Sequence, residues 1–530
     1  MTERQVERIR PNREACCYLD ECLALGKGLR ETPKIALALK SRGIVKGEVD
    51  LQDIAVSAAR ECYFRDPAQI RQRRSERDYS LADNTLEQGH LTTRGHAYLT
   101  FKIEGVSRNV VHEVLHRYPF YNTSQKSQRY AEIKVGSVVM PASLSEEQSS
   151  LYTEAVDHAG RAYRELVESD NLVRAVEDGL TKSYGSEGWR KLSGINVGKL
   201  CQESVRYVLP IGQMASMDHT INQLTLIRLF RDSQLPNFND EARFVIASMV
   251  KEVAKNDPTI QNDLRVLNLN NVERVSYDED EIRKWNKDFD GRLAGEPTVL
   301  VAGDNDRKML ADAIRGIRGV PESVLTDEEA LRLALNPEEN NLLADVFEAG
   351  IDDPLTSSLE QGRLGFITKL SHTADSQRQR QRMTPGATPP IEATYCGEAD
   401  YIVPGVVERN EQLRQRFVEI METQYDYVRR LVTLGTPKEW ALYLLPNAHA
   451  LRITETGGLM SWNHRFKDRI CNMAQEEIRA ISVRQAAMAE EVYPEAVFGP
   501  KCVVREVAGI KPRCPEKARS CVIGPRQWLV

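Results

Sequence analysis

Residues 107–130, SRNVVHEVLHRYPFYNTSQKSQRY, bring together side chains that could bind an anion. The segment holds two histidines, three arginines, a glutamate and several hydroxyl groups. Guanidinium groups bind phosphate or a polarised carbonyl in bidentate fashion, and hydroxyls and backbone amides can complete such a site. Ser127, Gln128 and Arg129 would place a hydroxyl, an amide and a guanidinium around one ligand. The competing interpretation is a solvated polar stretch where a helix begins, and composition alone leaves both open.

Two motifs in this segment resemble the signature of the flavin-dependent thymidylate synthases. In that family a strand leads into S-R-x-x-x-H-[EQ]-x-x-R-H-R, and S-x-x-S-x-R-[YF] follows after a short loop. Residues 107–108 and 112–113 of this chain match the first motif, and residues 124–130 match the second. The Arg-His-Arg core reads HRY at 116–118. With a gap elsewhere, residues 116–117 would instead be its last two positions, and both registers stay open.

The second half of the chain carries a further likeness to the same family. Residues 371–385, SHTADSQRQRQRMTP, are similar to the first motif, with Arg380 and Arg382 at the Arg-His-Arg core. The second motif is replaced there by TPGATPP. Residues 444–479 resemble the C-terminal run of the family, from its Leu-Pro turn to its Glu-Ile-Arg.

Positions that one half retains are lost in the other. Arg469 lies in the matched run of the second half, and Ser233 stands at the corresponding place in the first. Arg206 and Asn222 hold family positions in the first half, whereas Gly458 stands where the family has Asn in the second. These losses look complementary and predict composite sites built from unlike halves, although simple decay of both copies would leave a similar pattern.

The order of elements also repeats along the chain. Residues 298–319 resemble the first strand-and-helix unit, residues 356–369 correspond to 86–102, and residues 443–458 correspond to 207–222. Chance reuse of common elements is the alternative, but the shared order of several elements favours two copies of one module.

The resemblance implies a set of functional positions. Those implied to be catalytic are Ser127, Arg129 and Arg469. Those implied to bind substrate are Glu113, Gln128 and Arg206. Those implied to bind the cofactor are His116, Arg117, Asn222, Arg380, Arg382 and His464. No metal site is expected.

Each of these roles has a plainer structural alternative. His464 could be a histidine that packs against a neighbouring helix. Arg469 could form a surface salt bridge, which is the commoner fate of a helical arginine. Arg206 precedes the apolar stretch YVLP. Burying its guanidinium without a partner would be costly, so an anionic partner is expected there.

The resemblance implies an activity as well as a site. Family members transfer a one-carbon unit from methylenetetrahydrofolate to C5 of deoxyuridylate (dUMP), with reduced FAD as hydride donor and NADPH as reductant of the flavin. Arginines then polarise the uracil, and no cysteine nucleophile is needed. One alternative is a flavin enzyme that modifies another pyrimidine nucleotide. The other is a non-catalytic relative that binds a nucleotide.

Composition narrows the class of protein. The 530 residues carry a net charge of −6, which does not suit a binder of nucleic acid polymers. No stretch of eighteen apolar residues is present, and the charged N-terminus is unlike a secretory signal, so we expect a cytoplasmic protein without a membrane span. Ten cysteines are spread along the chain. Those at 502, 514 and 521 lack zinc-site spacing and are expected to be free thiols.

These residues must be positioned by an α+β fold. We expect two tandem thymidylate synthase-like modules that form an internal pseudo-dimer, so that a homodimer would equal the family's tetramer. Local patterns predict a helical preamble at 12–45, helices at 49–64, 150–193 and 235–255, and a strand at 97–106. The predicted units are a helical extension (1–48), a first module (49–275), a connector (276–297), a second module (298–500) and a C-terminal tail (501–530).

Overall fold

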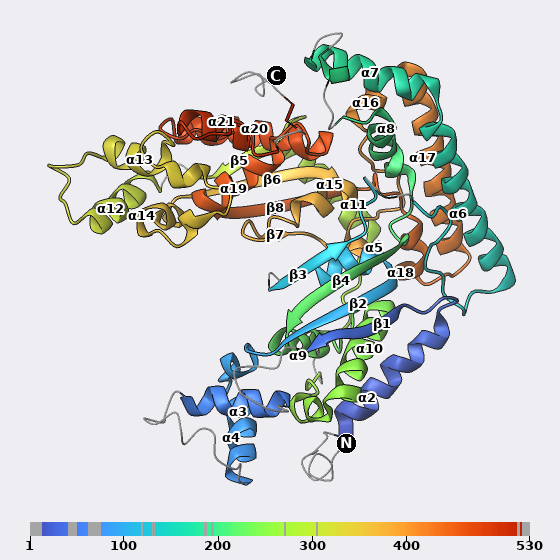
Figure 1. The fold of residues 1–530 in the computed structure, drawn as a ribbon. Helices are drawn as coiled ribbons and strands as arrows, with labels where there is room; N and C mark the ends of the chain where they lie inside the picture. The colour runs from blue at the N-terminus through green and yellow to red at the C-terminus, as the bar shows by residue number, and fades with distance from the viewer. Residues whose placement is uncertain are drawn as a thin grey trace.

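Two halves of similar construction make up the chain. A computed structural model describes residues 13–40, 50–61, 76–117, 120–129, 131, 133–184, 188–191, 195–269, 272–303, 306–516 and 520–521. Each half has a four-stranded antiparallel sheet with helices around it, and Figure 1 shows the sheet of the first half below that of the second.

The sheet of the first half has the strand order β1-β2-β4-β3. Apolar residues alternate along the second strand, so that Leu99, Phe101 and Ile103 point into the core of this half. Every neighbouring pair of strands is antiparallel. The strands are β1 (Lys34–Lys40), β2 (Tyr98–Ser107), β3 (Tyr121–Gln125) and β4 (Met214–Asn222).

The sheet of the second half repeats this topology in the order β5-β6-β8-β7. Its neighbouring strands are also antiparallel, and the register of the edge strand shifts in both halves, after the fourth residue of β1 and after the third residue of β5. The two sheets therefore share strand order, direction and an irregularity. The strands are β5 (Thr298–Ala302), β6 (Arg363–Ser371), β7 (Gly386–Ala387) and β8 (Ala450–Gly458).

Helices surround both sheets. Those of the first half are α2 (Arg13–Ala24), α3 (Leu51–Glu61), α4 (Glu76–Glu87), α5 (Arg108–Val110), α6 (Glu146–Val167), α7 (Asp170–Tyr184), α8 (Val197–Val205), α9 (Gln223–Asp232) and α10 (Asp240–Asn256). Those of the second half are α11 (Glu279–Leu293), α12 (Arg307–Arg318), α13 (Asp327–Leu335), α14 (Pro354–Ser357), α15 (His372–Arg378), α16 (Gly405–Glu408), α17 (Glu411–Thr433), α18 (Lys438–Ala441), α19 (Leu459–Arg469), α20 (Glu476–Val492) and α21 (Lys501–Val507).

Backbone hydrogen bonds join the halves with twofold symmetry. The N–H of Ile211 donates to the carbonyl of Leu445 at 2.8 Å, and the N–H of Asn447 donates to the carbonyl of Leu209 at 2.8 Å. Under this twofold symmetry, Leu209 is equivalent to Leu445 and Ile211 is equivalent to Asn447. The chain is thus an internal pseudo-dimer of two tandem modules, as the sequence predicts.

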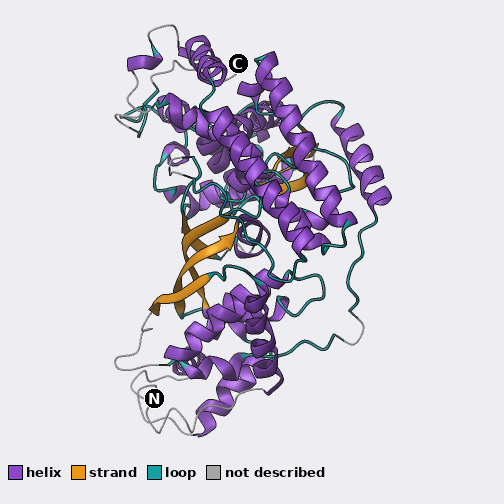
Figure 2. Ribbon diagram, turned by 90° about the vertical axis from the view of Figure 1, so that its right-hand side faces the viewer, coloured by secondary structure: helices purple, strands orange, loops and turns teal. Residues whose placement is uncertain are grey.

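The long helices α6 and α17 form a core that both halves share. Tyr152 and Tyr163 of α6 are buried in clusters that also contain Tyr425 and Phe417 of α17. Figure 2 looks onto the right-hand side of Figure 1 and shows long helices in front of the strands of the upper sheet. Burying one such apolar side chain contributes about 1.5–3 kcal/mol, so this shared core holds the modules in one arrangement.

Three local expectations need correction. The stretch predicted as a helical preamble holds α2 but also β1, whose backbone is satisfied by β2 rather than by helical bonds. The predicted connector forms helix α11, because Asp278 caps its first turn. Helix α21 opens the stretch predicted as a tail. None of the described helices is long and apolar enough to span a membrane.

Candidate active site

The segments that carry the two signature motifs begin in the same way in both halves. Strand β2 ends at Ser107, whose Oγ accepts the N–H of Val110 at 3.1 Å and caps the helical segment that follows. Strand β6 ends at Ser371, whose Oγ accepts the N–H of Ala374 at 3.0 Å. The strand-to-helix turn therefore projects the following side chains to where the two halves meet.

Five arginines from both halves form what we call the arginine cluster. Burial lowers the pKa of Arg108 to about 9, and the charge of Arg206 adds to this effect. Burial also lowers the pKa of Arg469 to about 10, with further lowering by Arg380 and Arg129. Because each guanidinium lowers the pKa of a neighbour, the cluster is a centre of positive charge. Its members are Arg108, Arg129, Arg206, Arg380 and Arg469.

Arg206 is the most deeply buried of the predicted site arginines. Its side chain is 4% exposed, and its Nε and Nη2 have no hydrogen-bond partner within the described part of the chain. Burial lowers its pKa, and the nearby Glu203 only partly opposes that effect. The Nε of Arg108 is likewise buried and unpartnered. A protein seldom buries such donors without an acceptor, so these atoms are suited to an anionic ligand.

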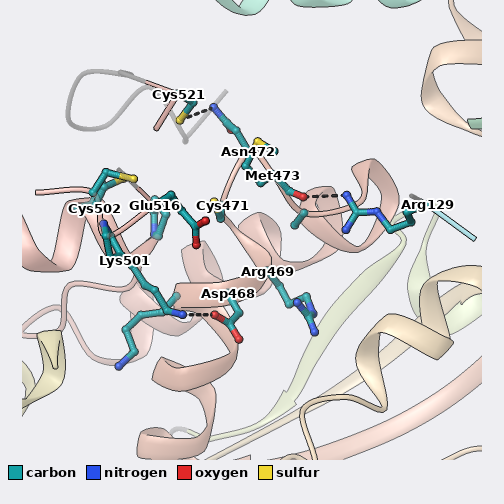
Figure 3. Close-up of a pocket in the computed structure, with 16 residues that line it drawn as sticks. Arg129, Asp468, Arg469, Cys471, Asn472, Met473, Lys501, Cys502, Glu516 and Cys521 are labelled. Atoms are coloured by element: carbon teal, nitrogen blue, oxygen red, sulfur yellow. Dashed lines mark hydrogen bonds and ion pairs between the residues drawn. The ribbon is translucent and has the colours of Figure 1, made fainter. Parts of the chain in front are cut away.

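Arg129 and Arg469 extend the cluster across the two halves. Arg129 forms an ion pair with Glu203. It also donates from Nη2 to the carbonyl of Met473 at 2.8 Å, as Figure 3 shows. Arg469 donates from Nε to the carbonyl of Gln377 at 3.2 Å. The first-half motif thus reaches a loop of the second half, and the predicted catalytic arginines lie close together.

Two amides add further donors to this region. The Nε2 atoms of Gln125 and Gln128 are buried without a partner in the described residues. Gln128 is held in place because its backbone carbonyl accepts the Nε2–H of Gln202 at 2.7 Å. Ser127 accepts the backbone N–H of Arg129 through Oγ at 3.1 Å, which shapes this turn. These donors would complement acceptor oxygens on a ligand.

A cavity of about 620 Å³, here called the larger cavity, also lies between the halves. His112, Glu113, His116 and Arg117 line it from the first half, and Arg382 lines it from the second. Four of its lining residues carry buried polar atoms that lack a partner within the described residues. These atoms are His112 Nδ1, His116 Nε2, Gln379 Oε1 and Gln381 Oε1.

Aromatic contacts order one wall of the larger cavity. The ring of His116 stacks on Tyr121 with centroids 4.8 Å apart, and the guanidinium of Arg382 lies 5.1 Å from the same ring centre. Burial lowers the pKa of His116 to about 3, so this imidazole is neutral at pH 7. Three of the predicted cofactor residues, His116, Arg117 and Arg382, therefore share one cavity.

Glu113 belongs to this cavity rather than to the turn at 127–129. Its Oε1 accepts the backbone N–H of Ile391 at 2.5 Å, and its Oε2 accepts the amide of Asn109 at 3.0 Å. Burial raises the pKa of Glu113 despite these bonds. Its carboxyl group therefore joins the two halves at the cavity wall.

The other three predicted cofactor residues do not line this cavity, and of these Arg380 belongs to the arginine cluster. Asn222 caps α9, because its Oδ1 accepts the N–H of Thr225 at 2.8 Å. His464 lies 3.2 Å from Glu348, measured between Nδ1 and Oε1. Neither residue lines the larger cavity. His464 thus contacts an acidic side chain outside the larger cavity.

A smaller cavity of about 160 Å³ adjoins Arg129 and Arg469. Figure 3 shows the ion pair between Lys501 and Asp468, at 2.8 Å, in its wall. The sequence did not predict this cavity, because its cysteines come from α21 and loops far apart in the chain. In the part of the chain that the structure describes, no three His, Cys, Asp or Glu side chains are grouped to hold a metal ion. The lining cysteines are Cys471, Cys502, Cys514 and Cys521.

Comparison with known proteins agrees with this architecture. The model of the family described as thymidylate synthase complementing protein matches residues 45–259 and 304–495, one match in each half. The chain belongs to this family. A flavin-dependent thymidylate synthase of Clostridium tetani is 27% identical over 39% of this chain and 80% of its own length. One from Geobacter sulfurreducens is 33% identical over 31% of this chain and 70% of its own length.

A solved structure is also similar to part of the chain. It is a UMP/dUMP methylase from Streptomyces cacaoi bound with 5-Br dUMP. The match has 16% identity and a TM-score of 0.31, and it covers 47% of this chain and 98% of that one.

The two thymidylate synthase complementing modules differ at the arginine cluster. The twofold relation makes Leu442 the equivalent of Arg206, because the neighbouring Tyr207 and Tyr443 accept equivalent backbone hydrogen bonds. Ser233 follows α9 where Arg469 ends α19, and its side chain instead bonds the carbonyl of Phe230 at 2.7 Å. Counting from Ser107 and Ser371, His372 of the second module is equivalent to Arg108 of the first, and His116 of the first is equivalent to Arg380 of the second. The arginine cluster therefore forms at one of the two places that the twofold symmetry relates, and the equivalent residues at the other place are different.

Proposed function

We propose that the chain is a flavin-dependent thymidylate synthase that transfers a one-carbon unit from methylenetetrahydrofolate to C5 of dUMP, with FAD as cofactor and NADPH as reductant. The observation that carries this proposal is the buried guanidinium of Arg206, whose Nε and Nη2 lack a partner among the described residues. A nucleotide phosphate or a uracil carbonyl would supply the missing acceptor.

Arginines of the cluster would also assist the reaction. A pyrimidine that is attacked or deprotonated develops negative charge on its carbonyl oxygens. Fixed guanidinium groups in a site that excludes water stabilise such charge without reorganising. Burial holds the guanidinium groups of Arg206 and Arg108 in place. Hydrogen bonds to backbone carbonyls hold those of Arg129 and Arg469.

The residues of the larger cavity fit a flavin. The cavity is within the volume range of small-molecule sites, and it combines aromatic, cationic and unpartnered polar groups. His116, Arg117 and Arg382 would hold the cofactor, with Arg380 close to His116. When bound, the flavin would supply the hydride chemistry that amino-acid side chains cannot. The chain itself orders the site and closes it between the two modules.

Flavin content and isotope release would test the proposal together. Purified chain would be denatured and its flavin quantified, and the native protein would be incubated with dUMP tritiated at C5. We expect bound flavin, and tritium release that depends on methylenetetrahydrofolate. No flavin after added FAD and no dUMP binding would overturn the proposal. Release from uridylate or deoxycytidylate but not dUMP would assign a related flavin enzyme instead.

We also infer that two chains assemble into a homodimer in the cytoplasm. Seven large apolar side chains between residues 301 and 351 are each more than 40% exposed, and association would remove this apolar surface from water. Light scattering should then give twice the chain mass of 60.0 kDa. A monomer at micromolar concentration would contradict this assembly. The apolar side chains are Val301, Met309, Ile317, Val324, Val346, Phe347 and Ile351.

A further inference from the structure

A histidine of one module and an aspartate of the other meet beside the larger cavity. Nε2 of His112 lies 2.5 Å from Oδ2 of Asp375. The two side chains are 4% and 0% exposed. Nδ1 of His112 is buried without a partner among the described residues, and His112 lines the cavity. One ring nitrogen is thus held by a carboxylate, while the other has no protein partner.

The guanidinium of Arg378 holds Asp375 in its ionised form. Nε of Arg378 donates to Oδ1 of Asp375, and Nη2 of Arg378 donates to Thr388 at 2.8 Å. Burial raises the pKa of Asp375, but Arg378 and His112 outweigh it and keep that pKa below its usual value. Because the carboxylate is charged, it accepts the Nε2–H of His112. In the tautomer that donates from Nε2, Nδ1 carries a lone pair.

Other titratable groups surround this pair. The ring centroid of His372 lies 4.2 Å from that of His112. Burial lowers the pKa of His372 well below its usual value, so it does not add a positive charge at neutral pH. Arg108, a member of the arginine cluster, also lowers the pKa of His372, which places the cluster beside the pair. Glu113 and His116 are also close, because a charge on His112 lowers the pKa of each of them.

The pair is absent from the related position of the pseudo-dimer. Counting from Ser107 and Ser371, Ser376 corresponds to His112 and Val111 corresponds to Asp375. Ser376 donates to the carbonyl of His372 at 3.0 Å, and Val111 packs into the core of the first half. A module of this fold therefore forms without a His–Asp pair at this place.

We propose that His112 is the general base that removes the C5 proton of the pyrimidine and that Asp375 is its positioning residue. This inference rests on the proposed function. Replacing the C5 hydrogen by a methyl group requires the C5–H bond to break after the new carbon–carbon bond has formed. The proton forms a bond with Nδ1 of His112, and the electron pair returns to the pyrimidine ring. Asp375 stabilises the resulting imidazolium until the proton passes to solvent.

Variants of the aspartate would test the inference. Asp375→Asn would remove the charge and favour the wrong imidazole tautomer, so we expect tritium release to fall by about 10²- to 10⁴-fold. dUMP affinity and flavin content should change by less than about threefold, because Asp375 does not touch either ligand in the proposal. Asp375→Glu should restore part of the rate. Asp263→Asn is a matched control, since Asp263 is also buried and pairs with Arg94 at 2.9 Å.

Nitrogen NMR of the ligand-free protein gives a second readout that does not depend on turnover. With ¹⁵N-labelled histidine, His112 should carry its proton on Nε2 in the wild type and lose that preference in Asp375→Asn. A proton on Nδ1 in the wild type would overturn the inference. So would an unchanged rate and pH profile in Asp375→Asn, and the proposed function would then still stand. If the wild type binds neither dUMP nor flavin, the proposed function itself fails.

Discussion

Replacing Arg206 by leucine should strengthen the fold and weaken nucleotide binding at the same time. The guanidinium is 4% exposed, and two of its donors are buried without partners in the described structure. The twofold-related residue is Leu442, which is fully buried in the shared core. Leucine is therefore a side chain that this place in the fold accommodates.

The size of both effects follows from the burial. An unsatisfied buried polar group costs about 1–3 kcal/mol, so Arg206→Leu should raise the free energy of unfolding of the ligand-free chain by a similar amount. Removing one partner of a buried charge pair costs about 2–5 kcal/mol of binding free energy. At about 1.4 kcal/mol per factor of ten, the dissociation constant for dUMP should rise by roughly 30- to 5,000-fold.

Urea unfolding and calorimetric titration with dUMP would measure the two effects. Arg94→Leu is the matched control, because Arg94 is equally buried but is bound by Asp263 and Thr85. Losing that pair should destabilise the chain by about 3–5 kcal/mol without changing dUMP affinity. If Arg206→Leu destabilises as much as Arg94→Leu and binds dUMP as well as the wild type, Arg206 is structural and our reasoning is wrong.

Three further predictions follow from other contacts. Burial raises the pKa of Glu439 from 4.5 to about 7, so the native state holds an extra proton between these values and stability should fall as pH rises through them. Urea unfolding should show that fall reduced in Glu439→Gln. Tyr207→Phe and Tyr443→Phe should each cost about 1–3 kcal/mol of unfolding free energy, because each tyrosine is buried and its hydroxyl bonds a glutamate carboxylate. Calorimetry should find weaker dUMP binding only for Tyr207→Phe, since Tyr207 adjoins Arg206. Burial raises the pKa of the Cys471 thiol to about 11, so in mass spectrometry iodoacetamide should label exposed Cys17 before Cys471; equal labelling would contradict a buried thiol.

Local patterns predicted the elements whose signals lie within a few residues. The strand expected at 97–106 is β2, because its alternation of apolar and polar residues reflects one buried face. The edge strand β1 was missed, since its hydrogen bonds come from residues about sixty to seventy positions away. A short apolar run such as KIALALK suits a helix or a strand equally well until its partner is known.

Distance along the chain also limited how much of the candidate site the sequence could predict. The residue types at 107–130 predicted a binding site for an anion. The apolar neighbours of Arg206 predicted that its guanidinium is buried and needs a partner. The pair of His112 and Asp375 joins residues 263 positions apart, so neither residue signals the other. The placement of Glu113 at the larger cavity likewise depends on the backbone of Ile391 in the other module.

The reciprocal bonds between Leu209 and Asn447 and between Ile211 and Leu445 close an interface within one polypeptide. When such an interface joins separate subunits, its occupancy falls on dilution. A covalent connection replaces that dependence with an effective concentration in the millimolar range. The facing arginines of the two modules should therefore stay opposed in a single molecule, even where the protein is scarce.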